Sequence, residues 1–482
     1  MGRISAYYAL PHPPIILPEV GRGEEAAIQE TINAFYKVSR EIADIRPDTI
    51  IIVTPHGPMF QDTVAIVKND EIQGDMSQFR APGVKFRTKI DMDLTDRIIQ
   101  LAEEQNIAAA EITKSSARRY GVSFELDHGT MVPMYFVNKE FNEYQLVHIT
   151  YGLLSKIQLY KFGICIQKAV EECKRNVVFI ASGDLSHRLI HDGPYSYSPY
   201  GEKFDNEIKR LLEEGDVEGI LSMDSVMIRE AGECALRSYY ILLGAMDGYD
   251  FKGQTLSYQG NFGVGYLVMS FHIEKNEEKS TKGQGNKAGS LIDRIIRKKE
   301  NEFQNKNIKK NPNVRLAGDS LMYYLVHGRN MKYIPSYVTD DMRNEKRGVF
   351  VSLKKNGNLR GCIGTIVPTT DSLAREIMRN AVEAGIYDPR FQPITLKELN
   401  ELEISVDILT EPEPAELSQL DPKKYGVIVR KGNQTGLLLP DLEGVDTVEA
   451  QLNIALQKAG IPPDSSYSIE RFQVIRYEDE KP

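Results

Sequence analysis

The chain has 482 residues, of which 41% are hydrophobic and 26% are charged. At roughly 100 to 200 residues per domain, this length predicts two to four folding units, and the composition excludes global disorder and a collagen-like repeat. The 59 Lys and Arg residues against 68 Asp and Glu residues give a formal net charge of -9. This charge would repel a phosphate backbone and therefore disfavours a nucleic-acid partner.

The sequence carries no sign of a membrane or export segment. No apolar run approaches the roughly 18 residues that a membrane span needs, and the first residues lack the apolar core of a signal peptide. Four cysteines, at positions 165, 173, 234 and 362, show no CxxC spacing and no disulfide density. Such cysteines fit a reducing compartment, so we expect a cytoplasmic protein with no membrane partner.

A polar segment divides the chain. Residues 274–290 read EKNEEKSTKGQGNKAGS and contain no aromatic and no Val, Ile, Leu or Met, which predicts a flexible linker. The lysine-rich residues 291–311 that follow have an apolar spacing that permits a short amphipathic helix. We therefore expect two domains, 1–273 and 312–482, joined by residues 274–311.

In the first domain, strand-like apolar runs alternate with helical patterns. The predicted strands are 4–9, 49–54, 146–150 and 177–181, and the predicted helices are 24–43, 94–102, 157–173 and 234–246. This order is typical of a βαβ series. The sequence thus predicts an α/β domain with a central, largely parallel or mixed sheet flanked by helices.

Four histidines of the first domain lie in segments rich in breakers or small residues. His12 follows the first predicted strand in LPHPP, and His56 follows the second in TPHGP. His187 follows the strand 177–181, and His128 stands in DHGT. Ligands of open α/β sheets bind beyond the carboxyl ends of the strands, so these imidazoles are predicted to converge on one site. The alternative for each is a turn residue with a satisfied hydrogen bond.

A carboxylate would turn such imidazoles into a known metal-binding set. Two imidazoles and one carboxylate with open positions form the facial triad that favours non-haem Fe(II). Glu233, between small residues at the start of the helical pattern 234–246, is the predicted carboxylate. The alternative is an ordinary first-turn glutamate that the helix dipole favours.

These segments resemble the class III extradiol ring-cleavage dioxygenases of the protocatechuate 4,5-dioxygenase type. The resemblance spans nearly all of residues 1–273 and is carried by the strand-end His12, TPHG at 54–57, LDHGT at 126–130, SGDLSH at 182–187 and Gly-Glu at 232–233. It implies that His12, His56 and Glu233 hold Fe(II). It also implies that His128 and His187 are catalytic residues that hydrogen-bond the substrate and move protons.

The implied reaction opens the ring of a small, catechol-like aromatic substrate with dioxygen. The metal would bring both reactants together. His187, with an ordinary pKa of about 6.5, is the predicted acid and base, because it can take a proton from a catechol hydroxyl. His128 is the predicted hydrogen-bond donor to the bound oxygen.

A related family leaves an alternative open. The Memo-like proteins share this fold and some of the histidines, but they place a cysteine where the dioxygenases have a carboxylate, and Cys234 adjoins Glu233 here. Neighbours on a helix face different ways, so one site is not expected to use both. Glu233 is predicted because it is the harder ligand, and Cys234 is expected to pack as a small apolar residue. A third alternative is an interaction scaffold whose closed, structural metal site takes Asp184 or Cys234 as fourth ligand.

The sequence of the second domain predicts an α+β fold. Helical patterns cover 316–326 and 372–383, and strands are predicted at 349–353, 359–363, 404–409, 427–430 and 436–439, with a hairpin turn at Asn356-Gly357. The segments LRGCIG at 359–364 and YDPRF at 387–391 resemble the AMMECR family. Cys362 is expected to be a buried residue that packs in the core, and the alternative is a reactive thiol.

The fusion of the two domains resembles the AmmeMemoRadiSam system. That resemblance implies a radical S-adenosylmethionine protein as a partner. Related enzymes commonly assemble as oligomers, so a homo-oligomer is also expected.

Overall fold

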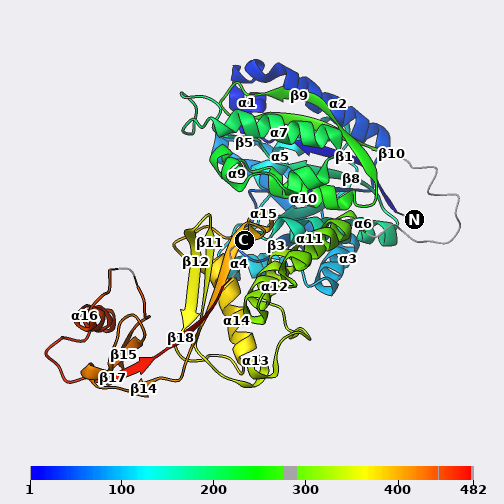
Figure 1. Ribbon diagram of the computed structural model, residues 1–482. Helices are drawn as coiled ribbons and strands as arrows, with labels where there is room; N and C mark the ends of the chain where they lie inside the picture. The colour runs from blue at the N-terminus through cyan, green and yellow to red at the C-terminus, as the bar shows by residue number, and fades with distance from the viewer. Residues whose placement is uncertain (1, 275–289, 443, 479–482) are drawn as a thin grey trace, which may run out of the picture. The chain divides into compact units, whose positions relative to one another are not determined.

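The computed structural model describes residues 2–274, 290–442 and 444–478 and divides into two compact units, Met1–Ile295 and Ile296–Pro482 (Figure 1). The segment predicted as a flexible linker, 274–290, lies almost entirely outside the described residues. The lysine-rich segment after it forms helix α11, Leu291–Asn307. Within the described ranges, every helix is too short or too polar to cross a bilayer.

The first unit is built on an eight-stranded sheet with the order β6-β3-β7-β2-β8-β1-β10-β9. Its strands are β1 Arg3–Leu10, β2 Thr49–Thr54, β3 Val64–Val67, β6 Ala109–Ile112, β7 Gln145–Thr150, β8 Asn176–Ser182, β9 Asp250–Gln259 and β10 Tyr266–Glu274. The central strands β7, β2, β8 and β1 are parallel, whereas β10 runs antiparallel to β1. This arrangement confirms the predicted α/β architecture with a mixed sheet.

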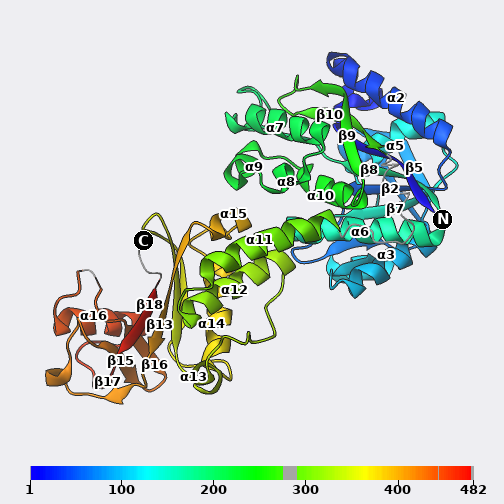
Figure 2. The same ribbon diagram turned by 45° about the vertical axis from the view of Figure 1, so that its right-hand side comes forward.

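Helices cover both faces of this sheet (Figure 2). Helices α3 Met92–Glu104, α6 Lys156–Cys173 and α10 Leu236–Ala245 pack together on one face, and α2 Gln29–Ile45 packs against α5 His128–Glu140 on the other. The parallel strands have the continuous burial of a two-sided core: all six residues of β2 are buried. The remaining helices of this unit are α1 Pro18–Gly21, α4 Lys114–Tyr120, α7 Tyr200–Glu214, α8 Val217–Leu221 and α9 Ser225–Ala231, and a hairpin joins β4 Glu71–Met76 to β5 Ala81–Lys89.

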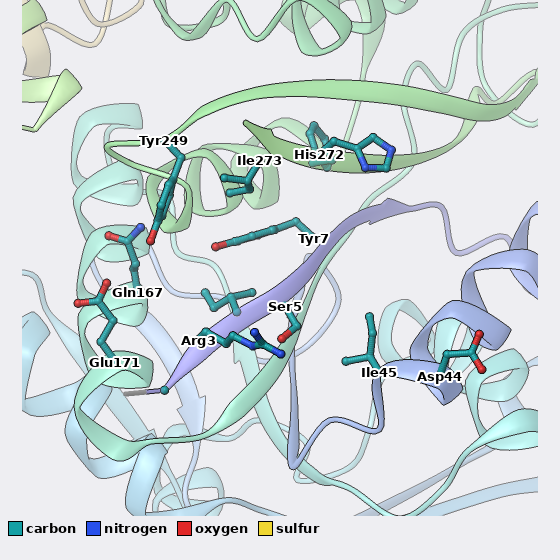
Figure 3. Close-up of a pocket in the computed structure, with 13 residues that line it drawn as sticks. Arg3, Ser5, Tyr7, Asp44, Ile45, Gln167, Glu171, Tyr249, His272 and Ile273 are labelled. Atoms are coloured by element: carbon teal, nitrogen blue, oxygen red, sulfur yellow. The ribbon is translucent and has the colours of Figure 1, made fainter. Parts of the chain in front are cut away.

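The two ends of the sheet differ. At the amino end of β1, the pairing with β10 starts only at Tyr7 opposite Phe271, and a cavity of about 670 Å³ lies there between Arg3, Tyr7, Glu171 and Ile273 (Figure 3). The carboxyl ends of β1, β2 and β8 carry the predicted histidines, at the opposite end of these strands.

The second unit contains two four-stranded antiparallel sheets. The first has the order β12-β11-β13-β18 and is covered by α12 Pro312–His327 and α14 Leu373–Val382. Its strands are β11 Val349–Lys355, β12 Asn358–Thr365, β13 Leu402–Leu409 and β18 Val474–Glu478. The predicted hairpin is confirmed: β11 pairs with β12, and both Asn356 and Gly357 have positive φ, as a tight Asn-Gly turn requires.

The second sheet has the order β14-β17-β15-β16 and packs against α16 Val448–Ala459. Its strands are β14 Glu413–Pro414, β15 Gly426–Lys431, β16 Gln434–Leu438 and β17 Ser468–Phe472. Short helices α13 Asp340–Asn344 and α15 Leu396–Leu399 connect the larger elements.

In the first sheet of this unit, Cys362 is only partly buried, and its sulfur accepts the Ser352 hydroxyl proton at 3.2 Å. The expected full burial of Cys362 is therefore wrong. The reason is its position on β12, which is an edge strand of the sheet and has a neighbouring strand on one side only.

Candidate metal centre

Neighbouring parallel strands bring the predicted histidines together. β1, β8 and β2 are adjacent, and they end two residues before His12, five before His187 and two before His56, respectively. His128 is the first residue of α5. Because the three strands run in the same direction, their carboxyl ends meet at one edge, and the segments that follow place the imidazoles there.

Three of the imidazoles form one compact group. The ligand nitrogens of His12, His56 and His128 all lie within 4.8 Å of one another. His12 Nε2 is 3.0 Å from His56 Nε2, and the rings of His56 and His128 stack with their centroids 4.1 Å apart. His12 is buried, His128 is half-buried and His56 is exposed, so the group has a closed side and an open side.

Hydrogen bonds decide which nitrogen of His12 faces this group. His12 Nδ1 lies 2.9 Å from Ser182 Oγ, and the Ser182 hydroxyl donates its only proton to the Gly129 carbonyl at 2.5 Å. His12 must therefore donate from Nδ1, which leaves the lone pair on Nε2. Burial, followed by the nearby His56 and His128, lowers the pKa of His12 well below its ordinary value, so the ring is neutral at pH 7.

His128 and His187 are also neutral at pH 7. Burial, followed by the proximity of His56, lowers the pKa of His128 to about 4, and burial lowers the pKa of His187. His187 donates from Nδ1 to the Gly232 carbonyl, which leaves Nε2 with a free lone pair. The structure thus places His128 in the ligand group itself and His187 beside it.

Cys234, and not Glu233, lies beside the imidazoles. Cys234 Sγ is 3.7 Å from His12 Nε2 and 3.9 Å from His187 Nε2. The Glu233 carboxylate instead accepts the Leu236 N–H at 2.6 Å, at the first turn of α10. This arrangement differs from the predicted ligand set and from the predicted apolar role of Cys234.

The reason lies in the backbone before α10. The sequence predicted a helix from residue 234, but α10 begins at Leu236, and Gly232 has φ +66. Residues 233–235 therefore form a turn in which the two side chains point to different places. Glu233 accepts the Leu236 N–H from a position before the helix, not as the first-turn residue of its alternative interpretation, and the thiol lies next to His12 and His187.

Asp184 borders the group without joining it. Its carboxylate accepts the His12 backbone N–H at 2.8 Å, and Oδ2 lies 3.9 Å from His12 Nε2. Burial raises the pKa of Asp184 to about 7, and burial raises the pKa of the Cys234 thiol well above its ordinary value. Both groups would release a proton more readily beside a bound cation.

A cleft of about 510 Å³ opens on the exposed side of the group. His56 and His128 line it, together with apolar side chains such as Met59 and with polar and acidic side chains from the β4 end and from residues 122–127. None of its thirteen described lining residues is Lys or Arg. The cleft is large enough for a single-ring molecule and is negatively charged.

Three residues that support the histidines, Thr54, His148 and Ser182, were not predicted from the sequence. Thr54 Oγ1 and His148 Nε2 both contact the Asp127 carboxylate. Burial alone would raise the pKa of Asp127, but hydrogen bonds from His148 and Thr54 hold it well below its ordinary value. One signal was available: a histidine inside an otherwise apolar predicted strand needs a buried polar partner.

Together, the fold and the imidazole group define an α/β protein with a candidate metal centre at the carboxyl ends of its central strands. Residues 6–269 match the family described as the catalytic LigB subunit of aromatic ring-opening dioxygenase, and residues 314–481 match AMMECR1. The chain belongs to the LigB family and carries a carboxyl-terminal AMMECR1 domain.

Similar proteins match the whole chain or parts of it. The protein CA_C1420 of Clostridium acetobutylicum is 52% identical over 476 residues, 99% of each chain. A protein of Thermotoga maritima is 50% identical over 173 residues, 35% of this chain and 99% of its own. Among solved structures, the uncharacterized protein PH0010 from Pyrococcus horikoshii covers 35% of this chain and 91% of its own at 33% identity and a TM-score of 0.32. The uncharacterized protein JW3007 from Escherichia coli K12 covers 55% of this chain and 98% of its own at 14% identity and a TM-score of 0.37.

Proposed function

We propose that the first unit binds one transition-metal ion through His12, His56 and Cys234, with His128 beside them. The carrying observation is the environment of His12 Nε2, whose lone pair faces His56 Nε2 at 3.0 Å and Cys234 Sγ at 3.7 Å. Tetrahedral ligands of one ion at ordinary bond lengths are separated by about 3.3 Å for two nitrogens and about 3.6 Å for nitrogen and sulfur. Both separations from His12 Nε2 are close to these values, which supports a shared ion, and imidazole with thiolate suits zinc or copper. This proposal corresponds to the Memo-like alternative, without ring cleavage.

A bound ion would polarise a coordinated oxygen and lower its pKa. The residues around it have complementary tasks. His187, held by the Gly232 carbonyl at Nδ1, accepts a proton at Nε2, which lies 3.9 Å from the thiol. The adjacent cleft binds a small molecule against His56 and His128.

A second candidate is an Fe(II)-dependent extradiol dioxygenase that acts on a catechol-like substrate with dioxygen. Membership of the LigB family and the ring-sized cleft beside the histidines favour it. In this candidate His12, His56 and Glu233 hold the iron, His187 is the acid and base, and His128 donates a hydrogen bond to the substrate. The Leu236 N–H is bound to Oε2 alone, so this candidate requires iron to bind Oε1 or the carboxylate to leave that N–H.

The experiment that separates the candidates is anaerobic purification with metal analysis, followed by a catechol panel under oxygen. Stoichiometric metal without oxygen uptake supports the first proposal. Oxygen uptake with a yellow ring-opened product supports the second. Absence of metal after purification, together with failure to bind added Co(II), Zn(II) or Fe(II), would contradict both. A radical S-adenosylmethionine partner stays a prediction from the resemblance.

A further inference from the structure

We infer that Thr54, Asp127 and His148 form a buried network that positions His56 and His128 for metal binding. The inference rests on the proposed metal centre and concerns residues that do not themselves bind the ion. It is carried by hydrogen bonds that converge on one carboxylate, which lies directly before His128 in the chain.

The Asp127 carboxylate fixes the start of helix α5. Its Oδ1 accepts the Thr130 N–H at 3.2 Å as the N-cap, and His128 is the first residue of that helix. Asp127 is 9% exposed, so its carboxylate depends on these protein donors rather than on water. Any shift of Asp127 would therefore move the backbone that carries the His128 imidazole.

The Thr54 hydroxyl connects this carboxylate to the second histidine. Thr54 Oγ1 donates to Asp127 Oδ1 at 2.5 Å and accepts the His56 backbone N–H at 3.3 Å. Gly129 allows this close approach, because a Cβ there would lie 2.4 Å from Thr54 Oγ1 and 2.9 Å from Asp127 Oδ1. One oxygen at the end of β2 thus links the supports of His56 and His128.

His148 holds the other oxygen of the carboxylate. It is 1% exposed on β7, and its Nε2 lies 2.9 Å from Asp127 Oδ2. The carboxylate acts as an acceptor toward Thr54 and Thr130, so His148 is the donor at Nε2. Among the described residues, Nδ1 of His148 has no hydrogen-bond partner, so the ring is retained in the core for its bond to Asp127.

The opposite end of β2 offers a matched control. Thr49 Oγ1 donates to the buried Asp91 carboxylate at 2.6 Å, and Asp91 is the N-cap of α3. The two threonines therefore lie on one strand and make the same kind of bond to the same kind of cap. Only the Thr54 bond leads to histidines of the metal centre.

The test compares Thr54→Val with Thr49→Val in the full-length chain. Apo-protein stability is measured by thermal unfolding, and metal binding by Co(II) titration with the visible d–d spectrum as readout. We expect similar losses of apo stability, but a Co(II) affinity about 10-fold to 100-fold weaker and an altered spectrum only in Thr54→Val, the range typical for loss of a residue that orients metal ligands. Thr54→Ser, which retains the hydroxyl, should restore the wild-type affinity and spectrum.

The outcomes separate this inference from the proposed function. If Thr54→Val binds Co(II) with the affinity and spectrum of the wild type, the positioning role alone is overturned. An equal loss of affinity in Thr49→Val also overturns it. Failure of the wild type to bind Co(II) overturns both. If Thr54→Val does not fold, the Co(II) affinities of His148→Gln and His148→Leu are compared instead. The Gln side chain keeps an amide donor, so His148→Gln should retain most of the Co(II) affinity that His148→Leu loses.

Discussion

The choice between Cys234 and Glu233 as metal ligand yields the sharpest prediction. Cys234→Ser removes the sulfur but keeps a small hydroxyl that can still accept the Asp184 N–H, now made to Sγ at 3.3 Å. Glu233→Gln keeps an oxygen that can accept the Leu236 N–H, now bound at 2.6 Å. Neither change opens a cavity, so both variants should fold.

The expected size of the effect follows from the number of ligand atoms. The proposed site has three, from His12, His56 and Cys234. A four-ligand zinc site binds with about 10 to 16 kcal/mol near neutral pH, so one ligand accounts for about 3 kcal/mol, or roughly a 100-fold change in affinity. We expect that loss in Cys234→Ser and less than a twofold change in Glu233→Gln.

The assay is Zn(II) competition against a chromophoric chelator, together with Co(II) binding. Thiolate ligation adds a sulfur-to-cobalt charge-transfer band in the near ultraviolet, and Cys234→Ser should lack it. Cys165→Ser is the control, because Cys165 is a buried thiol on α6 whose Sγ contacts the Leu101 carbonyl. Retention of the charge-transfer band in Cys234→Ser, or loss of metal binding in Glu233→Gln alone, would refute Cys234 as the ligand. Loss of metal binding in Glu233→Gln alone would support the Glu233 carboxylate as the ligand.

Carboxylates other than Glu233 give three further predictions. Burial raises the pKa of Asp205 to about 7, so the folded state holds its proton more tightly than the unfolded chain, and stability falls as pH rises from about 4 through 7. Asp205→Asn should flatten this dependence in urea titrations between these pH values, and an unchanged slope would contradict the buried-acid interpretation. Burial raises the pKa of Glu376, but hydrogen bonds from Thr365, Thr370 and Thr369 outweigh it and lower the pKa. Glu376→Gln has fewer acceptor oxygens, so it should destabilise the second unit by about 2 kcal/mol. Hydrogen exchange at residues 365–370 should become faster, and unchanged exchange would show that this segment does not depend on the charge of Glu376. Because Asp75 and Glu125 line the cleft and none of its described lining residues is Lys or Arg, the metal-loaded protein should bind an uncharged catechol several-fold more tightly than a carboxylated one by calorimetry at low salt, and the reverse preference would show that the cleft is not the binding site.

Local sequence patterns predicted much of the fold. The buried runs at β1, β2, β7 and β8 were predicted nearly to the residue, because a strand covered on both faces is continuously apolar. The antiparallel pair β9 and β10 was missed. β9 mixes exposed and buried residues along its length and lies at the sheet edge, so its sequence carries no comparable signal.

For the site, the sequence alone determined which histidines stand at strand ends, and the parallel order of the strands was enough to predict that His12, His56 and His187 converge. Tertiary structure alone decided which side chain lies beside the imidazoles. Whether Glu233 or Cys234 faces the imidazoles depends on the turn after Gly232 and on the late start of α10. Side-chain direction reverses with a change of a few backbone dihedral angles, and such angles in a short turn are set by distant contacts rather than by the residues themselves.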